Sequence, residues 1–209
     1  MEVVDLSHPI REDMPVFPGE EQPKIEIVAD MEHCGYHEKR FLLNSHTGTH
    51  LDVPKHVFQD GYSLEKYPVK KYIGQAIMIT LIDSGRIEIE ELAPYENALR
   101  DCDFMLVNTG WSRHWGSAQY YGDPPYFSRE AADWLSSFEL KGIGIDSPSV
   151  DQMSDQGLPV HRALLEKEIV IIENMTNFDQ LKKPVFTLYC LPLNIEGADA
   201  CPVRAVAVY

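Results

Sequence analysis

Three histidines and one aspartate lie within a single segment of eleven residues, His46–His56. His46, His50 and Asp52 offer two imidazoles and a carboxylate, and His56 adds a further imidazole. Nitrogen and oxygen donors of these types bind zinc, manganese and iron. The segment therefore predicts a site for a divalent metal with a base beside it.

The spacing of the three predicted ligands favours a kinked strand or a loop. Residues two apart in a strand lie about 7 Å apart on one face, so His50 and Asp52 can share an ion. His46 would reach His50 on one turn of helix, but residues 47–49 (Thr-Gly-Thr) are poor helix formers. Gly48 permits a kink instead. A helical zincin motif is also disfavoured, because no glutamate follows His46.

His56 lies beyond Pro54, which ends any regular strand after Asp52. A metal ion can ionise bound water near neutral pH, and an unligated imidazole can carry the proton to a leaving group. We therefore expect His56 to be the proton donor and acceptor of a hydrolytic reaction. A non-catalytic metal-binding protein is the alternative from another class, although a closed structural site would not need this base.

Further ligands are expected from the second half of the chain. His161 lies in the first turn of a helix that we expect to begin at Pro159 and to run to Lys167. Glu173 ends the apolar run 169–173. A buried carboxylate needs a partner, because its isolated burial is costly. That partner is either a metal ion or an arginine or lysine.

Three short apolar runs that end in polar residues are typical of buried strands: 104–108, 142–146 and 169–173. Residues 128–140 carry apolar side chains at helical spacing behind a serine cap. Alternating strands and helices predict an α/β fold with some parallel pairing. Reactive groups in such folds gather where strands end.

The first half of the chain is divided by proline and glycine. We expect strands at 3–6, 24–28 and 76–82, and a turn at 16–19. Pro94 interrupts a polar stretch, so any helix there should begin at this residue.

The length of 209 residues favours a single domain that spans residues 1–209. A net charge of −15 repels nucleic acid and anionic lipid surfaces. No segment approaches the roughly 18 apolar residues of a membrane span, so we expect a cytoplasmic protein. The four scattered cysteines lack the paired spacing of zinc ribbons, which leaves nitrogen and oxygen as the metal donors.

The segment HTGTHLDVPKH fits every fixed position of the pattern HxGTHxDxPxH. In this respect the chain resembles the bacterial cyclase family of metal hydrolases, which includes kynurenine formamidase and isatin hydrolase. The resemblance extends over nearly the whole chain, through DLSHPI, VFPGE, NTGW at 108–111, GIDSPSVD at 144–151, and His161 followed by Glu173.

This resemblance implies a swivelling β/β/α fold with a mixed sheet, in a homodimer or homotetramer. It implies one or two divalent ions, zinc first and manganese as the alternative. The matching proton donor and acceptor is His56, and the matching metal ligands are His46, His50, Asp52, His161 and Glu173.

The resemblance also implies a small-molecule substrate, N-formylkynurenine, which is hydrolysed to kynurenine and formate in tryptophan catabolism. Phe17 stands where the formamidases place a substrate-contacting tryptophan, and Glu20 stands where they often have aspartate. Trp111 and Trp115 are further candidates for an aromatic wall. The alternative is an isatin hydrolase-like enzyme for another cyclic amide or lactone, because the motif does not encode the leaving group.

Overall fold

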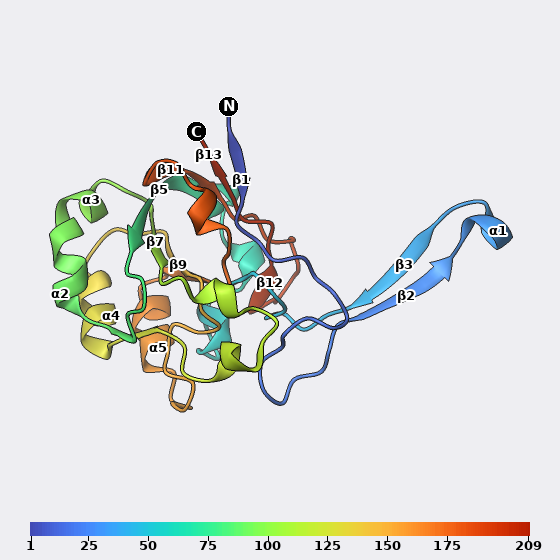
Figure 1. Ribbon diagram of the computed structural model, residues 1–209, viewed down its shortest axis with the longest axis horizontal. Coiled ribbons are helices and arrows are strands. Elements are labelled where there is room, and N and C mark those ends of the chain that lie inside the picture. The colour runs from blue at the N-terminus through green and yellow to red at the C-terminus, as the bar shows by residue number, and fades with distance from the viewer.

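A curled mixed sheet of nine strands forms the centre of the structure, a computed structural model that describes all residues 1–209 (Figure 1). The strand order is β1-β13-β11-β5-β7-β9-β10-β4-β12. The four strands from β5 to β10 pair in parallel, and all other neighbours are antiparallel. The expected α/β class with a mixed sheet is confirmed. The strands are β1 (Val3–Asp5), β4 (His50–Asp52), β5 (Ile73–Thr80), β7 (Phe104–Asn108), β9 (Gly142–Ile145), β10 (Val170–Glu173), β11 (Val185–Tyr189), β12 (Ala200–Pro202) and β13 (Val206–Val208).

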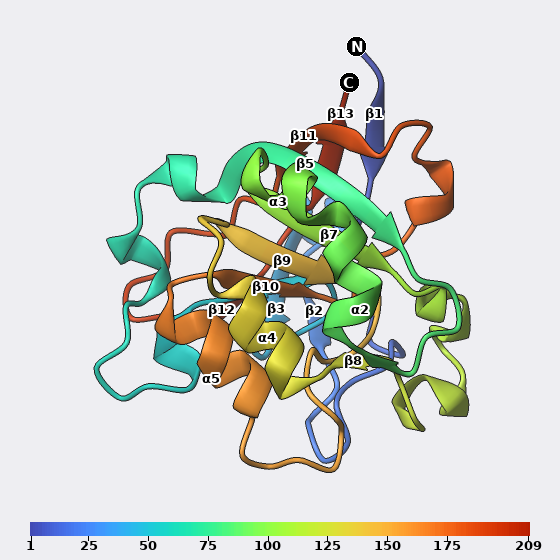
Figure 2. The same ribbon diagram turned by 90° about the vertical axis from the view of Figure 1, so that its left-hand side faces the viewer.

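Helices cover one face of the parallel strands (Figure 2). They are α2 (Ile89–Leu92), α3 (Glu96–Arg100), α4 (Arg129–Leu135) and α5 (Pro159–Glu166). Alternate residues of β7 pack into different cores, as the two-residue period of a strand requires. Met105 and Val107 pack with the helices, whereas Phe104 and Leu106 pack with β1, β11 and β13 on the other face. Both faces of the central strands are therefore buried, which explains their uninterrupted apolar sequences.

Gly144 in β9 allows two buried side chains to approach the strand closely. A Cβ atom at this position would lie 2.5 Å from both Leu106 Cδ2 and Met175 Sδ. Only glycine fits this position without displacing its neighbours.

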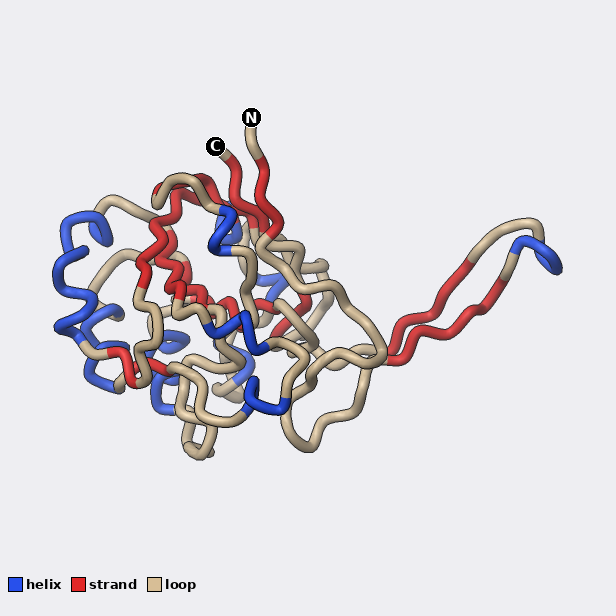
Figure 3. Tube along the Cα trace, viewed as in Figure 1, coloured by secondary structure: helices blue, strands red, loops and turns tan.

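A two-stranded ribbon projects away from the rest of the molecule (Figures 1 and 3). It consists of β2 (Lys24–Ala29) and β3 (Glu38–Leu42), which pair antiparallel, with the short helix α1 (Met31–Cys34) at its tip. We call residues 24–42 the arm. Every residue of β3 is exposed, and the arm has no core of its own. A second small sheet pairs β6 (Arg86–Ile87) with β8 (Tyr126–Phe127).

The helix expected over residues 128–140 is shorter than the apolar pattern suggested. It ends at Leu135, and the following two serines turn back onto it. The Ser136 hydroxyl donates to the Ala132 carbonyl, and the Ser137 hydroxyl donates to that of Trp134. The Ser136 N–H still donates to Ala132, but the N–H groups of Ser137 and Phe138 donate only three residues back, so the last turn tightens and the α-helix ends.

The expectation that a helix begins at Pro94 is wrong. Helix α2 begins five residues earlier with a capping box, in which the Glu88 N–H donates to the Glu91 carboxylate. Pro94 lies in a single 3-10 turn, Ala93–Tyr95, between α2 and α3. Proline is tolerated at the start of such a turn because its missing N–H would have had no partner.

None of the helices combines the length and the apolar character that crossing a membrane requires.

Candidate metal centre and cavity

Strand β4 carries two of the predicted ligands between two antiparallel neighbours. His50 and Asp52 lie two residues apart and so share one face of the strand. Strand β10 pairs with β4 so that Glu173 lies opposite His50. Gly48 adopts a left-handed backbone conformation, φ 65°, and His46 lies in the turn before it. The segment is therefore a turn, kinked at Gly48, that leads into a strand at His50, as the prediction of a kinked strand or loop allowed, and no helix forms.

Helix α5 presents His161 from the other side of the centre. The Asp151 carboxylate, in the loop after β9, accepts hydrogen bonds from the backbone N–H groups of Val160 and His161 at 2.8 and 2.9 Å. It also accepts from His161 Nδ1 at 2.7 Å. One carboxylate thus caps the helix and fixes the imidazole ring.

His50 and His46 are held in the same manner, each through the ring nitrogen that points away from Asp52. His50 Nδ1 donates to the Gly48 carbonyl at 2.8 Å. His46 Nε2 lies 3.0 Å from Asp199 Oδ2. Carbonyl and carboxylate oxygens only accept hydrogen bonds, so each of these nitrogens carries a proton and the inner nitrogen is left to a ligand.

The inner nitrogens converge on two carboxylates. Asp52 Oδ1 lies 3.0 Å from His46 Nδ1 and 3.4 Å from His50 Nε2. Asp52 Oδ2 lies 3.5 Å from His161 Nε2. Glu173 lies within 3.5 Å of His50 Nε2 and 3.3 Å of His161 Nε2. All five predicted ligands therefore lie around one point.

Several of these donor atoms are buried and form no hydrogen bond of normal geometry, and their close neighbours are other predicted ligands at 3.0–3.5 Å. They are His50 Nε2 and both carboxylate oxygens of Asp52, whose side chain is completely buried. Neither Asp52 nor Glu173 forms an ion pair with lysine or arginine. Unpaired buried polar atoms are costly, and a divalent cation would satisfy all three at once. The donor set therefore fits a metal ion, whereas the salt-bridge alternative for Glu173 is not observed.

The carboxylates favour the protonated forms of His46 and His161 before a metal binds. Burial opposes protonation of His46, but Asp52 and Asp199 outweigh it and raise the pKa of His46 to about 10. Burial likewise opposes the charged form of His161, yet hydrogen bonds to Asp151 and other carboxylates hold its pKa well above the usual value. The pKa of Asp52 is lowered despite its burial, because His46 and other histidines surround it. Metal binding would therefore release protons.

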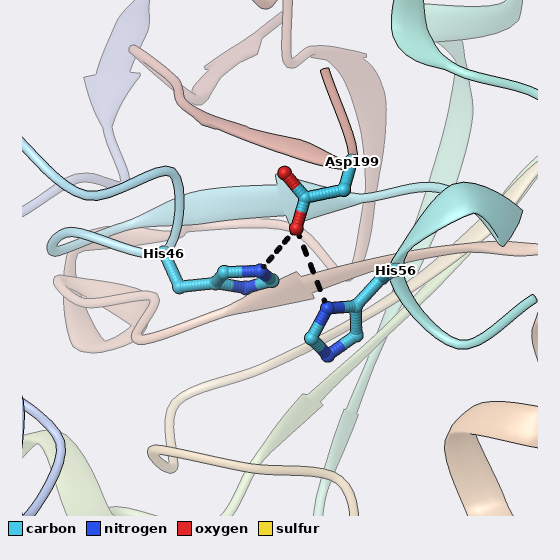
Figure 4. Close-up of side chains that lie close together, drawn as sticks. All are labelled: His46, His56 and Asp199. Carbon is cyan, nitrogen blue, oxygen red and sulfur yellow. Dashed lines mark hydrogen bonds and ion pairs between the residues drawn. The ribbon is translucent and has the colours of Figure 1, made fainter. Parts of the chain in front are cut away.

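His56 stands beside this group at the end of a 3-10 turn, Pro54–His56. Its ring centroid lies 4.2 Å from that of His46 and 5.5 Å from that of His161. Its Nδ1 lies 3.6 Å from Asp199 Oδ2 (Figure 4). The proline ends the strand, as expected from the sequence, and the turn brings His56 back to the centre.

A cavity of about 300 Å³ opens above the imidazoles. Phe17, Trp115 and Tyr121 line one part of it, and Phe17 meets Tyr121 edge to face at 6.1 Å. Trp111 does not line the cavity, so the expectation for this residue is wrong. Its indole N–H donates to the Tyr120 carbonyl instead.

The rest of the cavity lining is polar and partly acidic. Glu20 lies on the loop that also carries Phe17, and Asn44 donates to its carboxylate at 2.9 Å. Gln152 and Asp155 line the cavity from the loop before α5. No lysine or arginine is among the lining residues.

Sequence reasoning missed three polar residues around the centre. Asp151 lies within the segment 144–151, whose resemblance to the cyclase family was the available signal. Asn174 follows β10, and its amide donates to the Gly48 carbonyl at 3.0 Å. Asp199 directly precedes β12 and gives no local signal. Each of them holds a loop or ring of the centre in place.

The sequence of this chain is similar to a protein family and to several known enzymes. Residues 4–152 match the Cyclase family. Kynurenine formamidase of Bacillus cytotoxicus is 32% identical over 207 residues, which cover 98% of this chain and 96% of that protein. Kynurenine formamidase of Bacillus anthracis is 30% identical over 97% of this chain and 95% of its own.

Solved structures share the fold over the whole chain. Isatin hydrolase A from Labrenzia aggregata superposes with a TM-score of 0.88 at 24% identity, over 99% of this chain and 93% of that one. A predicted metal-dependent hydrolase from Bacillus stearothermophilus has a TM-score of 0.80 at 26% identity, over 99% and 97%. With most of its length matched by the family and its relatives aligned end to end, this chain belongs to the cyclase family.

Proposed function

We propose that this protein is a metal-dependent amide hydrolase, similar to kynurenine formamidase, that converts N-formylkynurenine to kynurenine and formate. One observation carries the proposal: the unpaired, buried donor atoms of His50 and Asp52 lie below a cavity with an aromatic wall, beside the imidazole of His56. The names of the relatives support the choice of reaction.

Zinc is the proposed ion, with manganese as the alternative. A divalent ion bound there supplies Lewis acidity and ionises water near neutral pH. The two oxygens of Asp52 face different imidazoles, so this carboxylate can serve either one ion or two. The residues that would hold the metal are His46, His50, Asp52, His161 and Glu173.

His56 is the proposed proton carrier. Its Nδ1 faces Asp199, and its other ring nitrogen points away from that carboxylate (Figure 4). That nitrogen accepts a proton from the attacking water and returns it to the departing amide nitrogen. Phe17, Trp115 and Tyr121 would hold an aromatic ring of the substrate by edge and face contacts.

The charge of the cavity favours a second candidate substrate. No lysine or arginine lines the cavity, so the α-carboxylate of formylkynurenine would find neither of these partners there. An uncharged cyclic aryl amide such as isatin avoids this cost. The second candidate is therefore a cyclic amide or lactone hydrolase that uses the same residues.

The test begins with elemental analysis of protein purified without added metal, followed by hydrolysis of formylkynurenine, isatin and simple aryl esters. We expect bound metal and turnover of formylkynurenine. Turnover of isatin alone would favour the second candidate. Bound metal without turnover of any substrate would refute the enzyme and leave a non-catalytic metal-binding protein.

A His56→Ala variant tests the proton carrier. Loss of general acid-base catalysis should lower kcat by roughly 10²- to 10⁴-fold while metal content is kept. His114→Ala is the matched control, because this ring contacts Trp111 and lies outside the cavity. Loss of metal from His56→Ala would make His56 a ligand and contradict the assigned role.

The arm supports a proposed homodimer or homotetramer. Ile27 and Phe41 are 70% and 61% exposed, and a two-stranded ribbon without a core is marginally stable alone. A second copy of this chain would cover these apolar side chains. Light scattering should show a dimer or tetramer that Ile27→Asp combined with Phe41→Asp dissociates, whereas Glu26→Gln should leave it intact. A monomeric wild-type protein would refute this proposal.

We also propose that residues 1–209 form one domain. Strand β1, near the first residue, pairs with β13, near the last, within the central sheet. Such pairing favours cooperative unfolding. Two separate calorimetric transitions in the metal-free protein would contradict it.

The proposed compartment is the cytoplasm. All four cysteines are free thiols, as is usual where glutathione keeps proteins reduced. Cell fractionation with an antibody against the protein tests this assignment.

A further inference from the structure

One carboxylate oxygen faces both a predicted metal ligand and the predicted proton carrier. Asp199 Oδ2 lies 3.0 Å from His46 Nε2 and 3.6 Å from His56 Nδ1 (Figure 4). The Asp199 backbone carbonyl accepts a hydrogen bond from Val53 N–H at 3.0 Å, which ties the residue to the end of β4. The position of the carboxylate is therefore set by the same strand that carries the metal ligands.

We propose that Asp199 is a positioning residue that fixes the orientation and the protonated nitrogen of both imidazoles. The inference rests on the proposed hydrolase function for the role of His56. An ionised carboxylate only accepts hydrogen bonds, so it retains the proton on His46 Nε2. Its negative charge, at an ion-pair distance of 3.6 Å, also favours the proton of His56 on Nδ1. The opposite nitrogen of each ring is then free, on His46 to bind the ion and on His56 to accept a proton.

The geometry on the other side of His46 agrees with this assignment. Its Nδ1 lies 3.0 Å from Asp52 Oδ1, at the point where the predicted ligands converge. Gly48 and Asp151 play the corresponding part for His50 and His161. Asp199 differs from them because it faces two rings, His46 through a hydrogen bond and His56 at ion-pair distance, and His56 is outside the ligand set.

The partial exposure of Asp199 also suits this residue to positioning the two rings. Its side chain is 37% exposed, whereas those of His46 and His56 are 20% and 24% exposed. The carboxylate therefore lies at the edge of the buried centre, where solvent can stabilise its charge.

A competing role is direct metal ligation by Asp199. Donor atoms of His46, His56 and Asp199 all lie within 4.8 Å of one another. Ligation there would use His46 Nε2 and would take His56 out of proton transfer. The two roles differ in metal stoichiometry, and that difference makes them separable.

The experiment compares Asp199→Asn with wild type and with Glu196→Gln. Both variants lose one negative charge from the same loop, but Glu196 is exposed and forms no ion pair or hydrogen bond with either ring. Zinc affinity is measured by chelator competition, zinc content by elemental analysis, and ring protonation by long-range ¹H–¹⁵N spectra of the histidines. Steady-state hydrolysis of the substrate found active in the panel gives kcat and KM.

We expect Asp199→Asn to retain the wild-type zinc stoichiometry while its zinc affinity and kcat each fall by roughly 10- to 100-fold. KM should change little, because Asp199 does not line the cavity. The spectra should show the proton of His56 redistributed between its ring nitrogens. Asp199→Glu restores the charge and should recover part of the loss, and it replaces Asp199→Asn if that variant does not fold. Glu196→Gln should match wild type throughout.

Wild-type affinity, kcat and histidine spectra in Asp199→Asn would overturn the proposal. Loss of one equivalent of zinc would also overturn it, in favour of ligation. If wild-type protein hydrolyses no substrate, the proposed function fails separately, and the zinc affinity and the spectra still decide whether Asp199 positions the rings.

Discussion

Replacing Asp151 with asparagine should weaken both the fold and the metal centre. The Asp151 carboxylate accepts three hydrogen bonds, one at Oδ1 from Val160 N–H and two at Oδ2 from the backbone and ring of His161. Asparagine retains one oxygen and can keep the Val160 contact, but its amide group would face two donors. Hydrogen bonds to charged groups contribute about 1.5–3 kcal/mol each, so losing two of them should cost about 2–4 kcal/mol after partial relaxation.

The assay is urea unfolding in the presence of a chelator, which separates stability from metal binding. The expected free energy of unfolding is lower by the stated amount, and the urea dependence should be unchanged if the transition remains two-state. Zinc affinity should fall by roughly 10- to 100-fold because the His161 ring is no longer held. Asp155→Asn is the matched control, since this exposed carboxylate in the same loop accepts only from Gly157 N–H.

The reasoning would be refuted by an Asp151→Asn variant whose unfolding free energy lies within about 0.5 kcal/mol of wild type. It would equally be refuted by unchanged zinc affinity, because the structure gives His161 no other partner for its Nδ1.

Three further predictions concern other parts of the molecule. Gly144→Ala should destabilise the protein by about 1–3 kcal/mol, measured by urea unfolding, because the new Cβ would overlap Leu106 and Met175. Burial lowers the pKa of His8 from 6.5 to about 4, so its contribution to stability is complete above pH 6.5 and declines as the pH falls toward 4. Between pH 7 and pH 4, the free energy of unfolding should therefore fall by about 1–2 kcal/mol more in wild type than in His8→Gln. This difference is smaller than the full linkage value because the ring is partly exposed. Chelation should lower the thermal midpoint of unfolding, and zinc at about 1,000 times its Kd should add roughly 4 kcal/mol to the free energy of unfolding at 25 °C. Calorimetry measures this gain, and its absence would show that the folded state does not bind the ion.

The central strands could be predicted because burial on both faces leaves a direct trace in the sequence. The runs 104–108 and 142–146 became β7 and β9 almost residue for residue. Helix ends were harder to predict. After Leu135 the backbone tightens to hydrogen bonds three residues back, while the apolar spacing continues to Phe138, so periodicity alone overextended the helix.

The centre was predictable where its residues are close in sequence. His46, His50 and Asp52 belong to one segment, and strand geometry limits how they can meet. Asp199 could not be found in this way, because it meets His46 across 153 positions of the chain. A single aspartate before a short strand resembles many surface residues, and only the folded sheet brings it to the imidazoles.

The place of β4 within the sheet affects how the chain can fold during synthesis. This strand is made early, yet both of its neighbours, β10 and β12, are made late. Thr49, just before β4, reaches its hydrogen-bond partner Asn174 only 125 positions further along the chain. Until those strands leave the ribosome, β4 remains an unpaired strand, and such long-range pairing folds slowly and favours aggregation. A metal ion therefore has no complete site on a partly made chain, because Glu173 on β10 is made late.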